Sequence, residues 1–516
     1  MSMLEKKRLN QLLYLLAFVK AVVPFFLQNG FYQPHRDEFL YLAEGHHLAW
    51  GFMEVPPLLS LFAWMTNFMD AGMFWIKIWP ALFGAFTFIL VGKIVISLGG
   101  KTFALILAWL PFMLSGYMRL FFLFQPNFLE VFFYVLITFS LFRYFQTQKN
   151  TWLYIFGIAT GLGLMSKYSV AFYVAGIMLA LILTPWRKLF LNKHFYISLF
   201  IAGLIFSPNI IWQYNHKFPV IAHMTELQTE QLKFIGYRDF LAGQLLICFG
   251  SLLTWFAGLF FLLVSKKGKP FRVFGFAYFF VIILLMILHG KDYYAMGLYP
   301  MLFAFGGYHL EKVTMHQWKW ARYLLILFPV LLGLYTLPLT MPLAKPDTLV
   351  KYYRSAHLDK TGSFQWEDHL QHPLPQDFGD MFGWKEFAET TAKVYHHLTP
   401  EEQKMTLIFC DGYFTAGALN YYRKNFNLPE TYSTSASFLT WMPDTFHINN
   451  IIFVDKNISE NDPVLQQFDN VVMMDSVSIP YFRESGTKVY LLQHAHEHVN
   501  EFLNGAVKKM KDKFRR

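Results

Sequence analysis

Charge is scarce in this sequence. Charged residues make up 15% of its 516 residues, whereas soluble domains contain about 25%. Hydrophobic residues reach 55%, which argues against an ordinary soluble enzyme and excludes disordered and low-complexity chains. Cysteine is nearly absent as well. Cys248 and Cys410 are the two cysteines, too few for a disulfide framework or a thiolate metal cluster.

Acidic residues are fewer than basic ones, 34 against 44, which gives a formal net charge of +10. In a soluble protein this excess would indicate nucleic-acid binding. Here the lysines and arginines cluster in short segments between apolar runs, as the orientation of a membrane protein requires. The charge pattern therefore favours a membrane protein with no nucleic-acid partner.

Long apolar runs are abundant. A helix that crosses a bilayer needs about 20 mostly apolar residues, and we find about eleven such runs. The fifth and sixth are short, and merging them would place the basic segment 266–269 outside the cytoplasm. We therefore keep them separate. The runs are residues 9–29, 73–98, 102–120, 128–146, 151–165, 169–185, 195–213, 240–264, 273–289, 293–310 and 322–341.

The basic residues orient these crossings. The N-terminus carries Lys6, Lys7 and Arg8, so we expect it in the cytoplasm. The even-numbered runs then return to basic loops, whereas most acidic residues fall on the opposite side. No small-residue cleavage site follows the first run, so we expect a retained anchor. An odd number of crossings places the chain after residue 341 outside the cytoplasm.

Residues 342–516 are more polar and alternate strand-like with helix-like segments. This alternation predicts a small extracytoplasmic α/β domain behind a transmembrane module of residues 1–341. The expected strands are residues 406–410, 451–455, 471–475 and 488–492, and the expected helices are 383–398, 413–425 and 497–516.

The first external loop, residues 30–72, is rich in ionisable residues. Its segment 37–50 has the apolar spacing of an amphipathic helix at the membrane interface. Asp37, Tyr41 and Glu44 share one face of that helix, and Glu54 precedes a rigid Pro-Pro turn. Carboxylates at such a place suit acid/base work, although Asp37 is equally well placed to cap the helix.

Several cations lie on the same external side. They are Arg36, Arg119, Lys167, Lys217 and Lys291. Lysines beside membrane helices often extend their ammonium groups towards water and do nothing more. The orientation rule disfavours them on this side, and several that converge would form a site for a lipid phosphate.

A third cluster, residues 125–130, enters the fourth run. Glu130 would lie a turn inside the membrane, where an acid usually has a partner or a purpose; the alternative is a helix start at Pro126. His46, His47 and His223 face the same side, but no metal-binding motif accompanies them. We therefore expect no required cofactor, with a divalent metal unsupported.

Together these segments resemble a known family. Asp37-Glu38 after the first run, followed by Glu54-Val55-Pro56-Pro57, resembles the polyprenyl-phosphate-sugar glycosyltransferases of the GT-C fold. That superfamily includes the protein O-mannosyltransferases and the lipid A aminoarabinose transferases. Segments 125–130, 161–168, 207–212 and 291–300 match its bacterial branch. Val55 departs from the aminoarabinose transferases, which carry a lysine there.

The resemblance implies a role for each site residue. Asp37 is the expected catalytic carboxylate, with Glu38 and Glu54 supporting it or binding sugar. Lys167, Lys291, Tyr293, Tyr294 and Arg119 are expected to hold the donor phosphate. We add Tyr41, Asn127 and Glu130 as further substrate-binding residues.

The sequence thus predicts an α-helical polytopic membrane protein of the GT-C fold in a bacterial inner membrane. The expected reaction is an inverting sugar transfer from a polyprenyl phosphate to an envelope acceptor outside the cytoplasm. The main alternative is a transporter or flippase of a lipid-linked saccharide, which would use charges at the bilayer midplane and often internal repeats; none is visible here. A passive anchor for an external binding domain, and a ligase or polymerase of the same fold, are the others.

Overall fold

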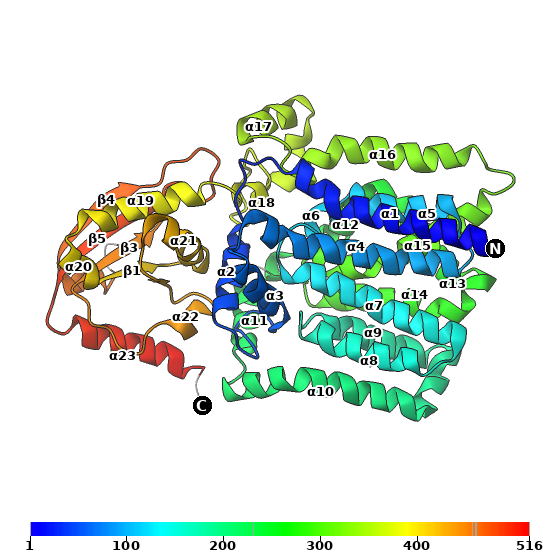
Figure 1. Cartoon of the computed structure of the whole chain (residues 1–516), viewed down its shortest axis with the longest axis horizontal. Coiled ribbons are helices and arrows are strands. Elements are labelled where there is room, and N and C mark those ends of the chain that lie inside the picture. The colour runs from blue at the N-terminus through cyan, green and yellow to red at the C-terminus, as the bar shows by residue number, and fades with distance from the viewer. Residues whose placement is uncertain (1, 231, 457, 460–461, 515–516) are drawn as a thin grey trace.

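A computed structural model describes residues 2–230, 232–456, 458–459 and 462–514. A bundle of long helices occupies one end of the molecule, and a smaller part with a β-sheet occupies the other (Figure 1). The bundle helices are α1 (Met3–Leu27), α4 (Met73–Ser97), α5 (Thr102–Met113), α6 (Tyr117–Leu120), α7 (Pro126–Thr147), α8 (Thr151–Leu164), α9 (Val170–Ile182), α10 (Lys193–Asn215), α12 (Tyr237–Ile247), α13 (Leu252–Leu263), α14 (Arg272–Ile287), α15 (Tyr299–Val313) and α16 (Ala321–Thr340).

Each predicted apolar run is helical in the structure, whole or in pieces. By length and composition, six helices of the described chain can cross a membrane, or eight if each of two bent pairs is one span. The chain is therefore a multi-pass membrane protein. The count of about eleven crossings stays a prediction. The fifth and sixth runs form two helices, α8 and α9, as predicted.

Small residues let the bundle helices approach closely. A Cβ atom on Gly157 of α8 would lie 2.2 Å from the carbonyl oxygen of Ser198 on α10. A Cβ atom on Gly258 of α13 would lie equally close, 2.2 Å, to the carbonyl oxygen of Leu302 on α15. Such contacts between backbones are a main source of packing energy where lipid removes the hydrophobic drive between helices.

The first external loop lies across the end of the bundle as α2 (Arg36–His46) and α3 (Leu58–Phe68). The predicted helix 37–50 thus begins one residue earlier and ends four residues earlier. His35 caps α2 in place of Asp37, so the capping interpretation of Asp37 is wrong. The helix ends early because residues 47–52 turn towards α10, where the Asn209 amide donates to the Trp50 carbonyl at 2.8 Å.

The polar C-terminal part contains a five-stranded sheet of order β2-β1-β3-β5-β4. β2, β1 and β3 are parallel, whereas β5 is antiparallel to β3 and β4. The strands are β1 (Thr406–Cys410), β2 (Thr431–Tyr432), β3 (Asn450–Asp455), β4 (Phe468–Ser476) and β5 (Lys488–Ala495). The predicted strands are all present; the two-residue β2 was not predicted because it is too short to show a pattern.

Helices surround this sheet. They include the three predicted ones, which the structure ends within four residues of the expected bounds. The helices of this part are α17 (Pro346–Ser355), α18 (Gln376–Gly379), α19 (Trp384–His397), α20 (Pro400–Lys404), α21 (Tyr413–Phe426), α22 (Phe438–Trp441) and α23 (Val499–Asp512).

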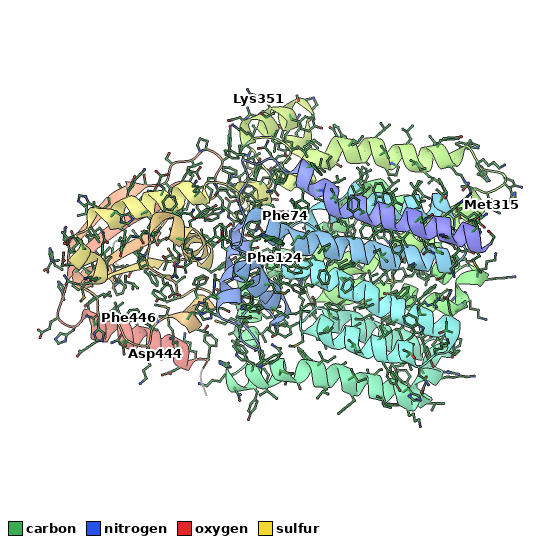
Figure 2. All side chains as sticks on the ribbon, viewed as in Figure 1. Phe74, Phe124, Met315, Lys351, Asp444 and Phe446 are labelled. Carbon is green, nitrogen blue, oxygen red and sulfur yellow. The ribbon has the colours of Figure 1, made fainter. Side chains whose placement is uncertain are left out.

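Helix α2 joins the two ends of the molecule. Phe39 on α2 is buried in the core of the C-terminal part, edge-on to Trp384 at 5.5 Å between ring centroids. Phe124, labelled in Figure 2, lies at the bundle end beside α2, and its amide donates to Glu38. Both ends of the molecule thus hold α2. The predicted boundary at residues 341–342 follows α16 directly and stays a prediction.

Candidate active site

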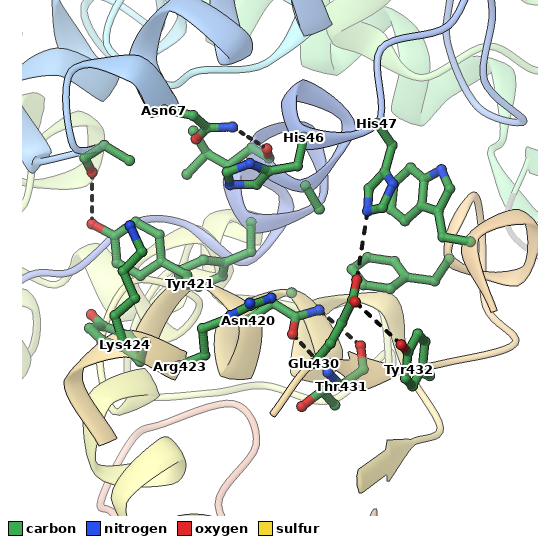
Figure 3. Close-up of a pocket in the computed structure, with 18 of the residues that line it drawn as sticks. His46, His47, Asn67, Asn420, Tyr421, Arg423, Lys424, Glu430, Thr431 and Tyr432 are labelled. Atoms are coloured by element: carbon green, nitrogen blue, oxygen red, sulfur yellow. Dashed lines mark hydrogen bonds and ion pairs between the residues drawn. The ribbon is translucent and has the colours of Figure 1, made fainter. Parts of the chain in front are cut away.

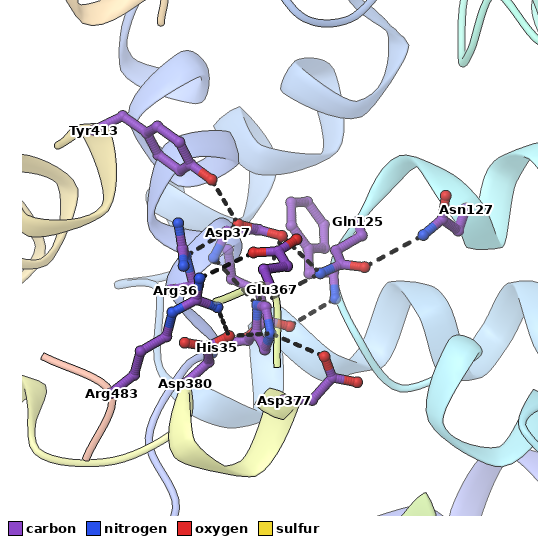
Figure 4. Close-up of polar contacts among 12 residues, drawn as sticks. His35, Arg36, Asp37, Gln125, Asn127, Glu367, Asp377, Asp380, Tyr413 and Arg483 are labelled. Atoms are coloured by element: carbon purple, nitrogen blue, oxygen red, sulfur yellow. Dashed lines mark hydrogen bonds and ion pairs between the residues drawn. The ribbon is translucent and has the colours of Figure 1, made fainter. Parts of the chain in front are cut away.

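Asp37 occupies the first turn of α2, where two other segments reach its carboxylate (Figure 4). The Tyr413 hydroxyl donates to one carboxylate oxygen at 2.9 Å, and the Gln125 amide donates to the other at 3.2 Å. The Arg36 side chain lies 3.7 Å away and stacks on Phe414. The Asp37 side chain keeps 31% exposure, so its carboxylate is oriented by the protein and still reachable by a substrate.

Glu38 has a different environment. Its side chain is fully buried and pairs with Lys77 of α4 at 2.5 and 2.7 Å. It also accepts hydrogen bonds from the backbone amides of His35 and Phe124, at 2.8 and 2.6 Å. Four contacts to a buried carboxylate suit a residue that holds α2 against the bundle, and we treat Glu38 as a positioning residue.

Lys167, between α8 and α9, belongs to a second polar cluster. Its ammonium donates to Asn127 and to Glu130, both at 2.7 Å. Glu130 is buried and also accepts from the Ser169 hydroxyl. Glu130 therefore has the partner that an acid at this depth requires. The Lys167 ammonium also lies over the rings of Tyr294 and Tyr293, 4.8 and 5.6 Å from their centroids.

Two amide side chains connect these clusters. Gln125 donates to Asp37 and accepts from Asn127 at 3.3 Å, and Asn127 in turn accepts from Lys167. A continuous hydrogen-bonded chain thus runs from Tyr413 through Asp37 to Lys167 and Glu130. It joins four segments far apart in the sequence, so the acid of the first loop and the downstream cations meet at one end of the bundle.

Arg119 and Lys291 reach the same region from other sides. Arg119 pairs with Asp377 at 2.7 Å, and Lys291 lies 3.5 Å from Glu367. Burial opposes ionisation of Asp377, but Arg119 and His35 outweigh it and lower the pKa of Asp377 below its usual value. Both cations are thus balanced by acids of the C-terminal part.

His35 anchors the base of this network (Figure 4). Its ring lies 3.7 Å from both Asp377 and Asp380, and Arg483 donates to Asp380 at 3.1 Å. Burial disfavours the charged ring, but Asp377, Asp37 and Asp380 outweigh it and raise the pKa of His35 above its usual value. A charged His35 would help to keep the neighbouring carboxylates ionised.

The remaining predicted acids lie on the rim of α2. Glu54 accepts from the backbone amide and the hydroxyl of Ser437, each at 2.6 Å, which fastens the loop to the C-terminal part. Glu44 is fully buried, and neither carboxyl oxygen has a hydrogen-bond partner among the described residues. Burial, with Glu54 nearby, raises the pKa of Glu44 well above its usual value. Burial and Asp37 likewise raise the pKa of Tyr41.

Some sequence-level candidates lie elsewhere. Lys217 donates to the Asp512 carbonyl at 2.6 Å, so it is no part of the cation cluster. His46 and His47 line a separate cavity. Among the described residues, no group of three or more His, Cys, Asp or Glu side chains has the arrangement of a metal site; whether the protein requires a metal stays a prediction.

Sequence reasoning missed the contribution of the C-terminal part. Tyr413, Asp377, Asp380 and Arg483 surround Asp37 and His35. No spacing rule connects them to the first loop, more than 300 residues away. The Asp-Gly dipeptide before Tyr413, at the end of a predicted strand, was the available signal, since functional side chains often follow strand ends.

Comparison with known proteins fits this arrangement. Residues 54–212 match the family model "dolichyl-phosphate-mannose-protein mannosyltransferase". ArnT from Cupriavidus metallidurans, solved with undecaprenyl phosphate, superposes with a TM-score of 0.61 over 93% of this chain and 97% of its own, at 12% identity. The chain has the GT-C fold. The apo structure of that ArnT gives the same TM-score and coverage at 13% identity.

These findings confirm the predicted resemblance and fold class, and they support the predicted enzyme class, a glycosyltransferase. A search of curated protein sequences found no match. The matched segment 54–212 includes Glu54, Asn127, Glu130 and Lys167. It stops short of Asp37 and Lys291, so the structure alone brings these two residues to the matched segment.

Proposed function

We propose that this protein is an inverting glycosyltransferase. It moves one sugar from a polyprenyl-phosphate carrier to an envelope acceptor on the extracytoplasmic face. The observation that carries the proposal is the hydrogen-bonded chain from Asp37 to Lys167, because it holds a reachable carboxylate near a cation at the membrane edge. The undecaprenyl phosphate in the similar ArnT structure supports a lipid-phosphate donor.

The proposed chemistry is a single displacement. The acceptor hydroxyl attacks the anomeric carbon, and the bond from that carbon to the phosphate oxygen breaks. Asp37 orients the hydroxyl and takes its proton. Negative charge grows on the departing phosphate, where Lys167, Lys291 and Arg119, with the hydroxyls of Tyr293 and Tyr294, stabilise it. Because the protein supplies these cations, we expect the reaction to need no divalent metal.

The membrane arrangement supports an extracytoplasmic site. The N-terminus lies at the bundle end opposite the C-terminal part (Figure 1). Basic loops share the N-terminal end: Lys101 pairs with Glu5 of α1 at 2.8 Å, and Lys312 donates to the Gly99 carbonyl. Such loops face the cytoplasm by the positive-inside rule. The site and the C-terminal part then face outward from a bacterial inner membrane.

The direct test is a transfer assay. Lipid-linked sugars are extracted from cells that lack the protein, in which the donor should accumulate. They are then incubated with membranes that contain wild-type or Asp37→Asn protein and with envelope material from the same cells. Wild-type membranes should form a new covalent sugar linkage, and the variant should form at least about a hundredfold less. Movement of the saccharide with its linkage unchanged would identify a transporter instead.

Equal transfer by Asp37→Asn would remove Asp37 from the chemistry. Asp359→Asn is the matched control, since Asp359 lies outside the network around Asp37. It should transfer like the wild type.

A further inference from the structure

A cavity of about 670 Å³ lies between α2 and α3 on one side and α21, β2 and α22 on the other (Figure 3). This volume falls within the range of about 300–1,000 Å³ that is typical of small-molecule sites. The role proposed for Asp37 does not involve this cavity.

The cavity is separate from the Asp37 site. Phe39, Leu42 and His46 line it, and at 100° per residue they fall on the face of α2 turned away from Asp37 and Tyr41. The thickness of one helix, about 10 Å, therefore separates the two sites. An extended molecule is long enough to occupy both around the edge of α2.

Planar polar side chains and aromatic rings line the cavity. His46 and Asn67 come from the α2–α3 side, and Arg423 and Glu430 come from the opposite wall (Figure 3). The Trp441 indole stacks on His47 with ring centroids 4.3 Å apart. Amide, carboxylate and guanidinium groups beside aromatic faces are suited to a ligand that has many hydroxyl groups and apolar C–H faces.

One lining group has a capacity that the protein leaves unused. Thr431 is 1% exposed, and its hydroxyl has no hydrogen-bond partner among the described residues. A buried polar group without a partner is costly, and a ligand hydroxyl at the cavity wall would satisfy it. Nor do Arg423 and Lys424 make a side-chain hydrogen bond or ion pair within the described part of the chain, whereas Glu430 accepts from Tyr432 at 3.2 Å.

The formal charges of the cavity cancel. Arg423 and Lys424 oppose Asp70 and Glu430. Burial, together with these two cations, lowers the pKa of His46 below its usual value, so its ring adds no charge near neutral pH. An electrically balanced lining favours an uncharged ligand over a phosphate or an acidic sugar.

The walls are held in place before any ligand binds. Both polar atoms of the Asn420 amide bond to the backbone of Thr431, at 2.8 and 2.9 Å. The Tyr421 hydroxyl donates to the Ala71 carbonyl at 2.9 Å, where the chain adopts a left-handed turn. A Cβ atom on Gly417 would lie 2.9 Å from Phe39, so the small residue lets α21 approach α2. Such preorganisation lowers the entropic cost of binding.

We propose that this cavity binds a neutral saccharide, the outer sugars of a glycan acceptor. Naming that saccharide as the acceptor rests on the proposed function; the saccharide site itself does not. A glycan held here would pass around the edge of α2 and present a hydroxyl to Asp37.

The test measures binding to the purified full chain in detergent by isothermal titration calorimetry. The probes are maltotetraose, mannotetraose and chitotetraose, and the neutral and acidic oligosaccharides released by mild acid from envelopes of cells lacking the protein. At least one neutral probe should bind the wild type. Thr431→Val and Glu430→Gln should weaken that binding about tenfold each. Thr390→Val and Glu389→Gln, on the exposed face of α19, are matched controls that should bind like the wild type.

Three results would overturn the proposal: no binding of any neutral probe, equal binding to both cavity variants, or binding of the acidic fraction alone. A thermal melt checks that each variant is folded, and Arg423→Gln replaces any variant that is not. Asp37→Asn separates this inference from the proposed function. It should bind the saccharide as the wild type does and fail to transfer. Binding without transfer by the wild type would refute the proposed function and leave the saccharide site standing.

Discussion

The buried pair of Glu38 and Lys77 gives a quantitative test of how α2 is held. Both side chains are 0% exposed, and their nearest atoms are 2.5 Å apart. Removing one partner leaves the other charge buried and unpaired, which costs about 3–5 kcal/mol. Lys77→Met should therefore destabilise the protein by about that amount. Glu38→Gln leaves Lys77 without its partner and should cost a similar amount.

The double variant makes the prediction sharper. With both charges gone, its loss of stability should be smaller than the sum of the single losses, by up to about 3 kcal/mol. Thermal melts in detergent, followed by tryptophan fluorescence, report the three variants against the wild type. Lys93→Met on the same helix is the control, because Lys93 bonds to the neutral side chains of Asn10 and Tyr14. Additive losses would refute the coupling.

The same variants test what Glu38 does. If Glu38 positions α2 and takes no part in the chemistry, the double variant should recover transfer activity relative to the less stable single variant. The kcat should follow the folded fraction, with little change in KM. A double variant that melts like the wild type yet has no activity would place the Glu38 carboxylate in the reaction itself.

Three further predictions concern the surroundings of Asp37. Tyr413→Phe removes a hydrogen bond to a charged group and should lower kcat about tenfold or more; an unchanged kcat would contradict a role for the C-terminal part in orienting Asp37. Burial raises the pKa of Asp380 to about 6, although Arg36 and Arg483 oppose this. The folded state then holds a proton that the unfolded state releases above the usual pKa of 3.8, so this group makes stability fall as pH rises from 3.8 to about 6. Thermal melts across that pH range should show a smaller decline for Asp380→Asn, and an unchanged decline would contradict the burial argument. EDTA should leave transfer activity intact, and a loss restored by a divalent cation would show that the site needs a metal.

Much of the fold was readable from the sequence because the membrane makes its demands locally. A crossing helix must be long and apolar, and its loops carry the orienting charge, so each apolar run became a helix. The strands of the C-terminal part were predicted for a similar reason: short β-branched and apolar segments alternate with polar ones. The end of α2 was misjudged because Asn209, on the distant α10, binds the chain after His47.

The site was only partly predictable. Asp37 and Lys167 stood out because ionisable groups are expensive near lipid. Gln125 belonged to a recognised cluster, yet its bond to Asp37 depends on how α2 lies across the bundle. Tyr413 could not be predicted, since an ordinary tyrosine on a soluble helix carries no signal until the tertiary structure brings it to Asp37.

The central claim is that one end of the bundle brings the Asp37 carboxylate and the donor phosphate together. A structure of the protein bound to a polyprenyl phosphate tests it most directly. The account predicts the phosphate beside Lys167 and Lys291, with space for a sugar between it and Asp37. A phosphate at the opposite end of the bundle, or on a surface that Lys167 does not reach, would contradict the account.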